Sequence, residues 1–321
     1  MPAPEVSVVI GAYNCGPYIR ETVYSVINQT FKDWELIIVD DGSSDDTYKI
    51  ACDIRDERIK VIRLNKNSGL PAISRNTGIK ASRGEFIAFL DHDDIWFPDK
   101  LNIQLRYLKE DPAIGLVCCN LKIISSDKRI NNMNHIFDNR LRSGYLYNEL
   151  MSSNFIVCSS VVTRMSLMRD AGYFDEDPNI VACEDLDLWL RIARQNKIIF
   201  IPQALGAYRV HDSNRSSDGK QLQRCLYIVD KHLKKNWVAE NQANRARANL
   251  SFIRGWALID KDAKLARELF LRSLNFDKSN VKKVCIVSFA LILSAFPFLT
   301  RFIKKHFLDK KLNSIIRLQG L

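Results

Sequence analysis

The sequence lacks several signatures that would assign it to common functional classes. No Gly-x-Gly-x-x-Gly pattern follows the first apolar segment, which speaks against a dinucleotide-dependent oxidoreductase. The eight cysteines form no Cys-x-x-Cys pair, and some lie in apolar runs, as Cys118 and Cys119 do, so we expect buried free thiols in a reducing compartment. Residues 1–13 have no basic segment and only a short apolar run. We therefore expect no signal peptide and a cytoplasmic protein.

The composition is that of a globular protein. Hydrophobic residues make up 46% of the 321 residues and charged residues 26%, so the chain can bury a full core. The formal net charge of +10 would suit nucleic acid, a membrane surface or an anionic substrate. Many basic residues lie in the last third and no nucleic-acid signature accompanies them, so a membrane surface is favoured over nucleic acid.

Apolar strand-like segments alternate with helix-like segments in the first part of the chain. Each of the first two strand candidates runs into a polar loop and then into a segment with helical spacing of apolar residues. Such alternation predicts an α/β fold with a mostly parallel, Rossmann-like sheet flanked by helices. The predicted strands are residues 6–10, 35–39, 59–64, 86–90, 114–119 and 155–162.

An acidic motif follows the apolar run 86–90. Asp91, Asp93 and Asp94 place three carboxylates within four positions, where a parallel sheet presents its ligands. Oxygen ligands of this kind suit Mg²⁺ or Mn²⁺, which could in turn hold a diphosphate. On these residues alone, a solvated turn with one carboxylate capping the next helix is an equally good interpretation.

The segment 84–94, Gly-Glu-Phe-Ile-Ala-Phe-Leu-Asp-His-Asp-Asp, resembles the signature of family 2 glycosyltransferases, which have the GT-A fold. The resemblance covers roughly the first two thirds of the chain. It implies a GT-A catalytic domain over residues 1–220, with a mixed, mostly parallel sheet, and an Mn²⁺ or Mg²⁺ ion held by Asp93 and Asp91. It also implies that Asp91 contacts the sugar nucleotide.

The same resemblance assigns the first half of the chain to the donor nucleotide. Ala12 and Tyr13 end the first strand, where the family positions the base, and the Tyr13 ring could stack on it or simply be a loop aromatic. Asp40 and Asp41 end the second strand, and a carboxylate there can accept the imide N–H of uracil or a ribose hydroxyl. Arg75 matches the arginine of the family's Arg-Asn pair, and its guanidinium could pair with the diphosphate.

Two further positions complete the expected site. Glu184 and Asp185 begin an amphipathic helical segment, whose N-terminus favours an ionised carboxylate. By the resemblance Asp185 is the general base and Glu184 a binding or orienting residue, although an N-cap without chemistry stays open. His211 is either a third metal ligand or an exposed loop histidine.

Residues 221–321 are expected to form a C-terminal helical region. Residues 250–259 and 263–274 have the pattern of an antiparallel helix pair. The uncharged segment 284–300 has basic flanks and, as a helix, would be roughly 25 Å long, short of the roughly 30 Å bilayer core. It is expected to lie on the cytosolic face of a membrane, or else to pack inside the protein.

The sequence therefore predicts an inverting, metal-dependent glycosyltransferase. It would move a sugar from a nucleotide-diphosphate donor, with a uridine diphosphate sugar expected, to a glycan or lipid-linked acceptor hydroxyl in surface polysaccharide synthesis. No nucleic acid partner is expected. The alternatives are transfer to a polyprenyl phosphate, and a non-catalytic nucleotide-sugar binding module with a helical docking tail.

Overall fold

The computed structural model describes residues 3–125, 130–135, 143–211, 219–259 and 261–277. The chain divides into two compact units: unit 1 comprises residues 1–146 and 156–212, and unit 2 comprises residues 147–155 and 213–321. The domain boundary predicted at 220/221 stays a prediction. The segment 284–300 lies outside the described residues, and among the helices that are described none is both long and apolar enough to cross a membrane.

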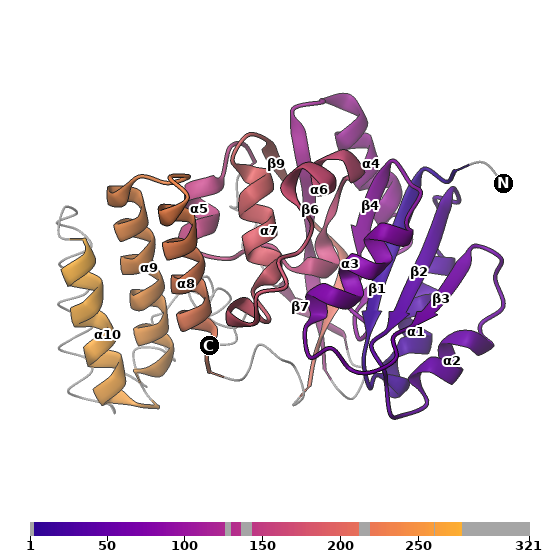
Figure 1. The fold of residues 1–321 in the computed structure, drawn as a ribbon, viewed down its shortest axis with the longest axis horizontal. Coiled ribbons are helices and arrows are strands. Elements are labelled where there is room, and N and C mark those ends of the chain that lie inside the picture. Colours follow the sequence, from indigo (N-terminus) through magenta and orange to yellow (C-terminus); the bar gives the residue numbers. More distant parts are fainter. Residues whose placement is uncertain (1–2, 126–129, 136–142, 212–218, 260, 278–321) are drawn as a thin grey trace. The chain divides into compact units, whose positions relative to one another are not determined.

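Unit 1 contains a mixed sheet with helices packed alongside it (Figure 1). Over the described residues the strand order is β3-β2-β1-β4-β8-β6-β9-β5, with β7 paired to β6. The strands are β1 Val6–Ala12, β2 Trp34–Asp40, β3 Ile59–Arg63, β4 Phe86–Phe89, β5 Ile95–Trp96, β6 Ile114–Ser125, β7 Ile130–His135, β8 Val162–Arg164 and β9 Lys197–Val210. The helices are α1 Gly16–Ile27, α2 Thr47–Asp53, α3 Pro71–Ala81, α4 Lys100–Glu110, α6 Met165–Ala171 and α7 Glu184–Ala193, with short 3₁₀ helices at Cys158–Ser160 and Pro178–Ile180.

Strands β1 to β4 are parallel, as the alternation of strands and helices predicts. β1 lies between β2 and β4 and is parallel to both, and β3 continues beside β2. All seven residues of β2 and all four of β4 are buried, which is why β4 and residues 36–39 of β2 read as unbroken apolar runs. Helix α3 packs closely on this part of the sheet at Gly78, where an added Cβ would lie 2.5 Å from Val9 Cγ1.

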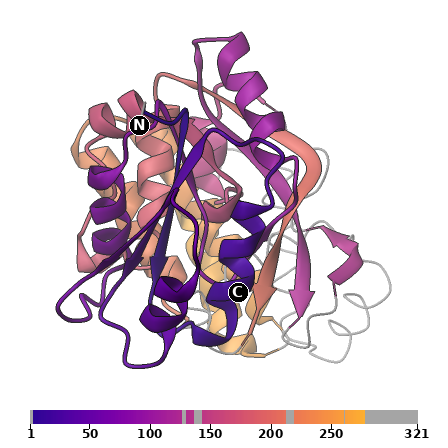
Figure 2. The same ribbon diagram turned by 90° about the vertical axis from the view of Figure 1, so that its right-hand side faces the viewer.

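The other half of the sheet differs from the prediction in two places. Residues 155–162 do not form one strand: Cys158–Ser160 is a 3₁₀ turn, and only the short β8 reaches the sheet, antiparallel to β4. Ser160 closes that turn, since both its N–H and its hydroxyl donate to the Val157 carbonyl. Strand β6, expected to end at residue 119, continues to Ser125 and pairs with β9 along its length (Figure 2).

Unit 2 is helical over its described residues, with α5 Tyr147–Ser152, α8 Gln221–Lys234, α9 Glu240–Leu258 and α10 Ala263–Phe276. Helices α9 and α10 contain the predicted helix pair and pack closely, because Gly255 leaves room for the Phe270 ring, 2.8 Å from where a Cβ would lie. Ser273 also donates to the Ala248 carbonyl across this contact, at 2.7 Å. The addition of α5 was not predicted; its Tyr147 hydroxyl lies 2.8 Å from Nδ1 of the buried His232 in α8.

Candidate active site

The parallel strands bring the predicted polar residues to one edge of the sheet. Ala12 and Asp40 are register partners at the ends of β1 and β2, and the Asp41 N–H donates to the Ala12 carbonyl at 2.8 Å. The loop after β4 meets the same edge, because His92 Nδ1 lies 3.0 Å from the Gly11 carbonyl oxygen. Ala12, Asp41 and the acidic motif are therefore neighbours, as expected for the carboxyl ends of parallel strands.

The two aspartates after β2 have different partners. Asp40 is fully buried and pairs with Arg63 at 3.2 Å, so its carboxylate braces β2 against β3. Asp41 accepts from both the N–H and the hydroxyl of Ser68, at 3.0 and 2.8 Å, and thereby holds the loop that leads into α3. Ala12 is buried and Tyr13 half-buried beside this loop.

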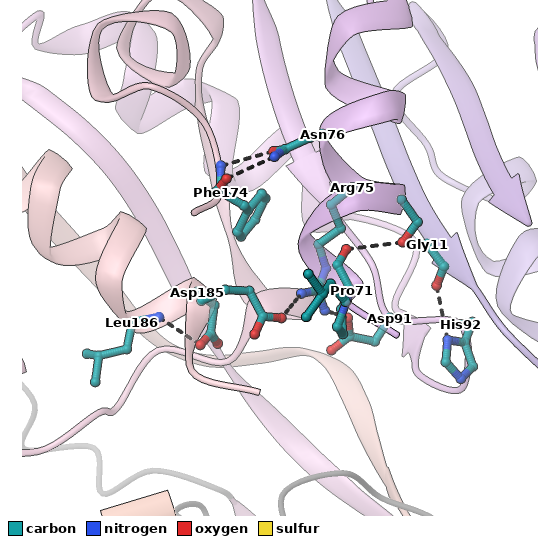
Figure 3. A network of polar contacts seen from close by, with 12 residues as sticks. Gly11, Pro71, Arg75, Asn76, Asp91, His92, Phe174, Asp185 and Leu186 are labelled. Atoms are coloured by element: carbon teal, nitrogen blue, oxygen red, sulfur yellow. Dashed lines mark hydrogen bonds and ion pairs between the residues drawn. The ribbon is translucent and has the colours of Figure 1, made fainter. Parts of the chain in front are cut away.

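Arg75, on α3, joins two carboxylates from distant parts of the chain. Its Nη2 lies 2.7 Å from Asp91 Oδ1 and its Nη1 2.5 Å from Glu184 Oε1. Figure 3 shows Arg75 and Asp91 close to each other. The guanidinium is only 13% exposed, so both ion pairs are largely shielded from water. Arg75, Asp91, Glu184 and the adjacent Asp185 are called the base-side cluster below.

The neighbouring Asn76 of α3 holds the backbone at Phe174 in place beside Arg75. Its amide exchanges hydrogen bonds with the backbone of Phe174, donating to the carbonyl at 2.8 Å and accepting from the N–H at 3.0 Å (Figure 3). The Phe174 ring in turn lies 5.4 Å from the Arg75 guanidinium carbon. Asn76 is thus a brace for the segment that precedes α7.

Asp185 lies in the first turn of α7 and accepts the Leu186 N–H at 2.7 Å. Burial, together with the charge of Glu184, raises the pKa of Asp185 to about 7, although Arg75 opposes the shift. The helix N-terminus and the resemblance predicted that Asp185 is available as a proton acceptor at neutral pH, and that role stays a prediction. Burial and the adjacent negative charge shift the pKa in the direction opposite to that expected from a helix terminus.

Asp93 and His211 form a second group, called the metal-side pair below. His211 Nε2 lies 2.7 Å from Asp93 Oδ2, and the imidazole stacks on Tyr18 of α1 with ring centroids 5.1 Å apart. Burial works against ionisation of Asp93, but the hydrogen bond from His211 and the nearby histidine charges outweigh it, and its pKa is lowered. His211, which the sequence left between a ligand and an exposed loop residue, is half-buried against Asp93.

The donor atoms of the metal-side pair fit a divalent cation. A carboxylate oxygen and an imidazole nitrogen suit Mn²⁺, and Asp93 is held in its ionised form. Within the described part of the chain, no three His, Cys, Asp or Glu side chains form a ready-made metal cage. Asp91 Oδ1 is paired with Arg75, so Asp93 is the better placed of the two predicted carboxylate ligands.

The sequence analysis missed the residues that hold the acidic motif in place. Ser159 donates to Asp94 Oδ2 at 2.5 Å and accepts the Asp91 N–H at 3.0 Å, and the Arg209 N–H donates to Asp94 Oδ1 at 2.8 Å. Burial raises the pKa of Asp94 well above its usual range, and the charges of Asp93 and Asp91 add to this. Asp94 is therefore an anchor of the motif. Its partners lie 65 and 115 positions away, and no local pattern identifies them.

Comparison with known proteins identifies the family. Residues 7–172 match the family described as Glycosyl transferase family 2. The chain is 43% identical over 229 residues, 66% of its length and 80% of the relative's, to WfaP of Escherichia coli, named a UDP-Glc:alpha-D-GlcNAc-diphosphoundecaprenol beta-1,3-glucosyltransferase. It spans about half the length, 47%, of two other curated relatives that it matches over 90% of its own residues.

Two solved structures share the fold. Staphylococcus aureus TarS 1-349 in complex with UDP-GlcNAc aligns with a TM-score of 0.63 at 21% identity, over 98% of this chain and 90% of the other. The mannosyltransferase PcManGT from Pyrobaculum calidifontis, in complex with GDP-Man and Mn²⁺, aligns with a TM-score of 0.60 at 18% identity, over 99% and 87%. The prediction of a GT-A fold with a mixed sheet is thereby confirmed.

Proposed function

The chain belongs to glycosyl transferase family 2, and we propose that it transfers a hexose from a uridine diphosphate sugar to the hydroxyl of a glycan or lipid-linked acceptor, with inversion at the anomeric carbon. One observation carries the proposal. Arg75 bridges Asp91 of the acidic motif and Glu184 beside the candidate base. A carboxylate expected to contact the donor and one expected to lie near the acceptor therefore meet at one edge of the sheet.

The donor side is proposed to bind the nucleotide at the ends of β1 and β2. Tyr13 and Ala12 would face the base, Asp41 would accept from uracil or ribose, and Arg75 would contact the diphosphate. Asp40 contributes by fixing the end of β2 through Arg63. The name of the Escherichia coli relative includes UDP-Glc, and TarS was solved with UDP-GlcNAc, which supports uridine as the base.

Asp93 and His211 are proposed to hold Mn²⁺ or Mg²⁺, with Asp91 as the second carboxylate. Such an ion would neutralise negative charge that develops on the departing diphosphate. Mn²⁺ in the PcManGT structure supports this choice of cation. Asp93 is suited to the task because its lowered pKa keeps it ionised.

Asp185 is proposed to accept the proton of the acceptor hydroxyl while that oxygen attacks the anomeric carbon from the face opposite the diphosphate. A base with a pKa near 7 is well matched to neutral pH, because a useful fraction is ionised and its affinity for the proton is high. Glu184, held by Arg75, would orient the acceptor. Direct displacement of this kind inverts the sugar and needs no covalent enzyme intermediate.

The lipid-linked acceptor named for the Escherichia coli relative also supports a role in surface polysaccharide synthesis. We propose that the protein works in the cytoplasm, at the cytosolic face of the membrane, where such an acceptor would be found. Peripheral contact through residues 284–300 is part of that proposal.

Nucleotide binding tests the proposal most directly. Isothermal titration with the diphosphates of uridine, guanosine, thymidine and adenosine, each with and without Mn²⁺, should show the tightest binding for the uridine nucleotide in Mn²⁺. Product analysis with UDP-sugars and a polyprenyl-diphosphate-linked sugar should then give a β-linked disaccharide from an α-linked donor. Absence of nucleotide binding in either condition would contradict the proposal. Nucleotide binding without sugar transfer would favour the non-catalytic nucleotide-sugar binding module, and transfer to a polyprenyl phosphate would identify the alternative acceptor.

A further inference from the structure

Arg209 lies behind the acidic motif and is one of the largest fully buried side chains of unit 1. It belongs to β9, two residues before His211. Strand β5, directly after the motif, pairs with β9 at Ile95 and Ala207, so the motif is already tied to β9 on its C-terminal side. Gly206 permits this pairing, because a Cβ there would lie 2.6 Å from the Ile95 carbonyl oxygen.

Arg209 extends that pairing into the motif itself. Its backbone N–H donates to Asp94 Oδ1 at 2.8 Å, so a side-chain carboxylate takes the place of the next strand carbonyl. Its Nε donates to the backbone carbonyl of Asp93 at 2.7 Å. One residue of β9 therefore holds two successive residues of the motif.

The rest of the guanidinium connects this contact to α1. Nη2 lies 2.9 Å from Glu21 Oε2, and the guanidinium carbon is 5.1 Å from the centroid of the Tyr18 ring. Tyr18 also stacks on His211, the other member of the metal-side pair. His211 directly follows the end of β9, two residues after Arg209, and both side chains contact the Tyr18 ring.

We propose that Arg209 is a positioning residue that sets the separation between Asp93 and His211 and so the affinity of the site for its divalent cation. The inference rests on the proposed metal role of that pair. Arg209 controls the pair from both sides, through the Asp93 backbone and through Tyr18 beneath the imidazole. Residues that orient metal ligands typically contribute about 10- to 100-fold to metal affinity.

The test is an electron paramagnetic resonance titration of Mn²⁺ at saturating UDP, with the melting temperature measured in parallel. Arg209→Gln should raise the Kd for Mn²⁺ by about tenfold or more. Arg209→Lys should also weaken binding, because an ammonium cannot donate to the Asp93 carbonyl and Glu21 in the fixed fork geometry of arginine.

Arg164→Gln is the matched control. Arg164 is also a largely buried arginine of the same sheet, but it pairs with Phe86 at the other end of β4 and donates to the Leu108 carbonyl. The Arg164→Gln variant should be less stable than the wild type and should have the wild-type Kd for Mn²⁺. Equal Kd values for Arg209→Gln and the wild type, or an equal rise in Arg164→Gln, would overturn the inference.

If Arg209→Gln does not fold, Glu21→Ala provides the same test, since the Glu21 side chain is 39% exposed and its loss frees one end of the guanidinium. It should raise the Kd for Mn²⁺ by a smaller factor, and no rise would overturn the inference. A wild-type protein that binds no Mn²⁺ at saturating UDP would refute the proposed metal role and this inference together. If the wild type binds Mn²⁺ and the variant binds it with the same Kd, this inference alone would be refuted.

Discussion

The base-side cluster and the metal-side pair lie at the same edge of the sheet but are built differently. In the base-side cluster one buried guanidinium is shared by Asp91 and Glu184, and the remaining carboxylate, Asp185, keeps a pKa of about 7. In the metal-side pair Asp93 faces an imidazole, and its pKa is lowered. The difference shows that two carboxylates at one edge of the sheet can have pKa values shifted in opposite directions, raised at Asp185 and lowered at Asp93.

Replacing the candidate base should have the largest effect. Asp185→Asn removes the proton acceptor, so kcat should fall by about 10²- to 10⁴-fold, measured by release of UDP. The Kd for UDP with Mn²⁺ should not change, because the metal-side pair is untouched. Asp187→Asn is the control: Asp187 lies on the same helix but pairs with Arg191, and that variant should retain turnover. Unchanged kcat in Asp185→Asn would remove Asp185 as the base.

The reciprocal substitution sharpens the comparison. Asp93→Asn should raise the Kd for Mn²⁺ at saturating UDP by at least about tenfold, since loss of a ligand costs no less than loss of a residue that orients one. Asp40→Asn is a suitable control, because Asp40 is an equally buried aspartate at the same edge that pairs with Arg63. Comparable Mn²⁺ affinity in Asp93→Asn and the wild type would place the metal elsewhere.

The smallest expected effect is a shift in pH dependence. If ionised Asp185 is required, kcat should rise with pH through about 7. Glu184 raises the pKa of Asp185, so Glu184→Gln should move this limb to lower pH. Arg75 lowers the same pKa, so Arg75→Gln should move it to higher pH, each by roughly one unit. Shifts in the same direction would show that the two groups do not act on Asp185 through their charges.

Much of unit 1 could be predicted from short stretches of sequence. Strands β1 to β4 follow from local apolar runs, although the short β5 was not predicted, and the acidic motif follows from residue type at the end of a buried run. The prediction failed at residues 155–162, where an apolar composition suggested a strand but Ser159 and Ser160 form a hydrogen-bonded turn instead. Ser159 of that turn also holds the acidic motif, through Asp94 and the Asp91 N–H.

The sequence by itself determined which residue types stand at the ends of the parallel strands, because the apolar runs and the polar loops that follow them are encoded locally. The tertiary structure decided how they are grouped: Arg75 with Glu184 across 109 positions, and Asp93 with His211 across 118. It also decided the surroundings of Asp185, where burial and the charge of Glu184 raise the pKa. A pKa depends on burial and on charges brought close by folding, and the helix terminus that the sequence displays does not reveal them.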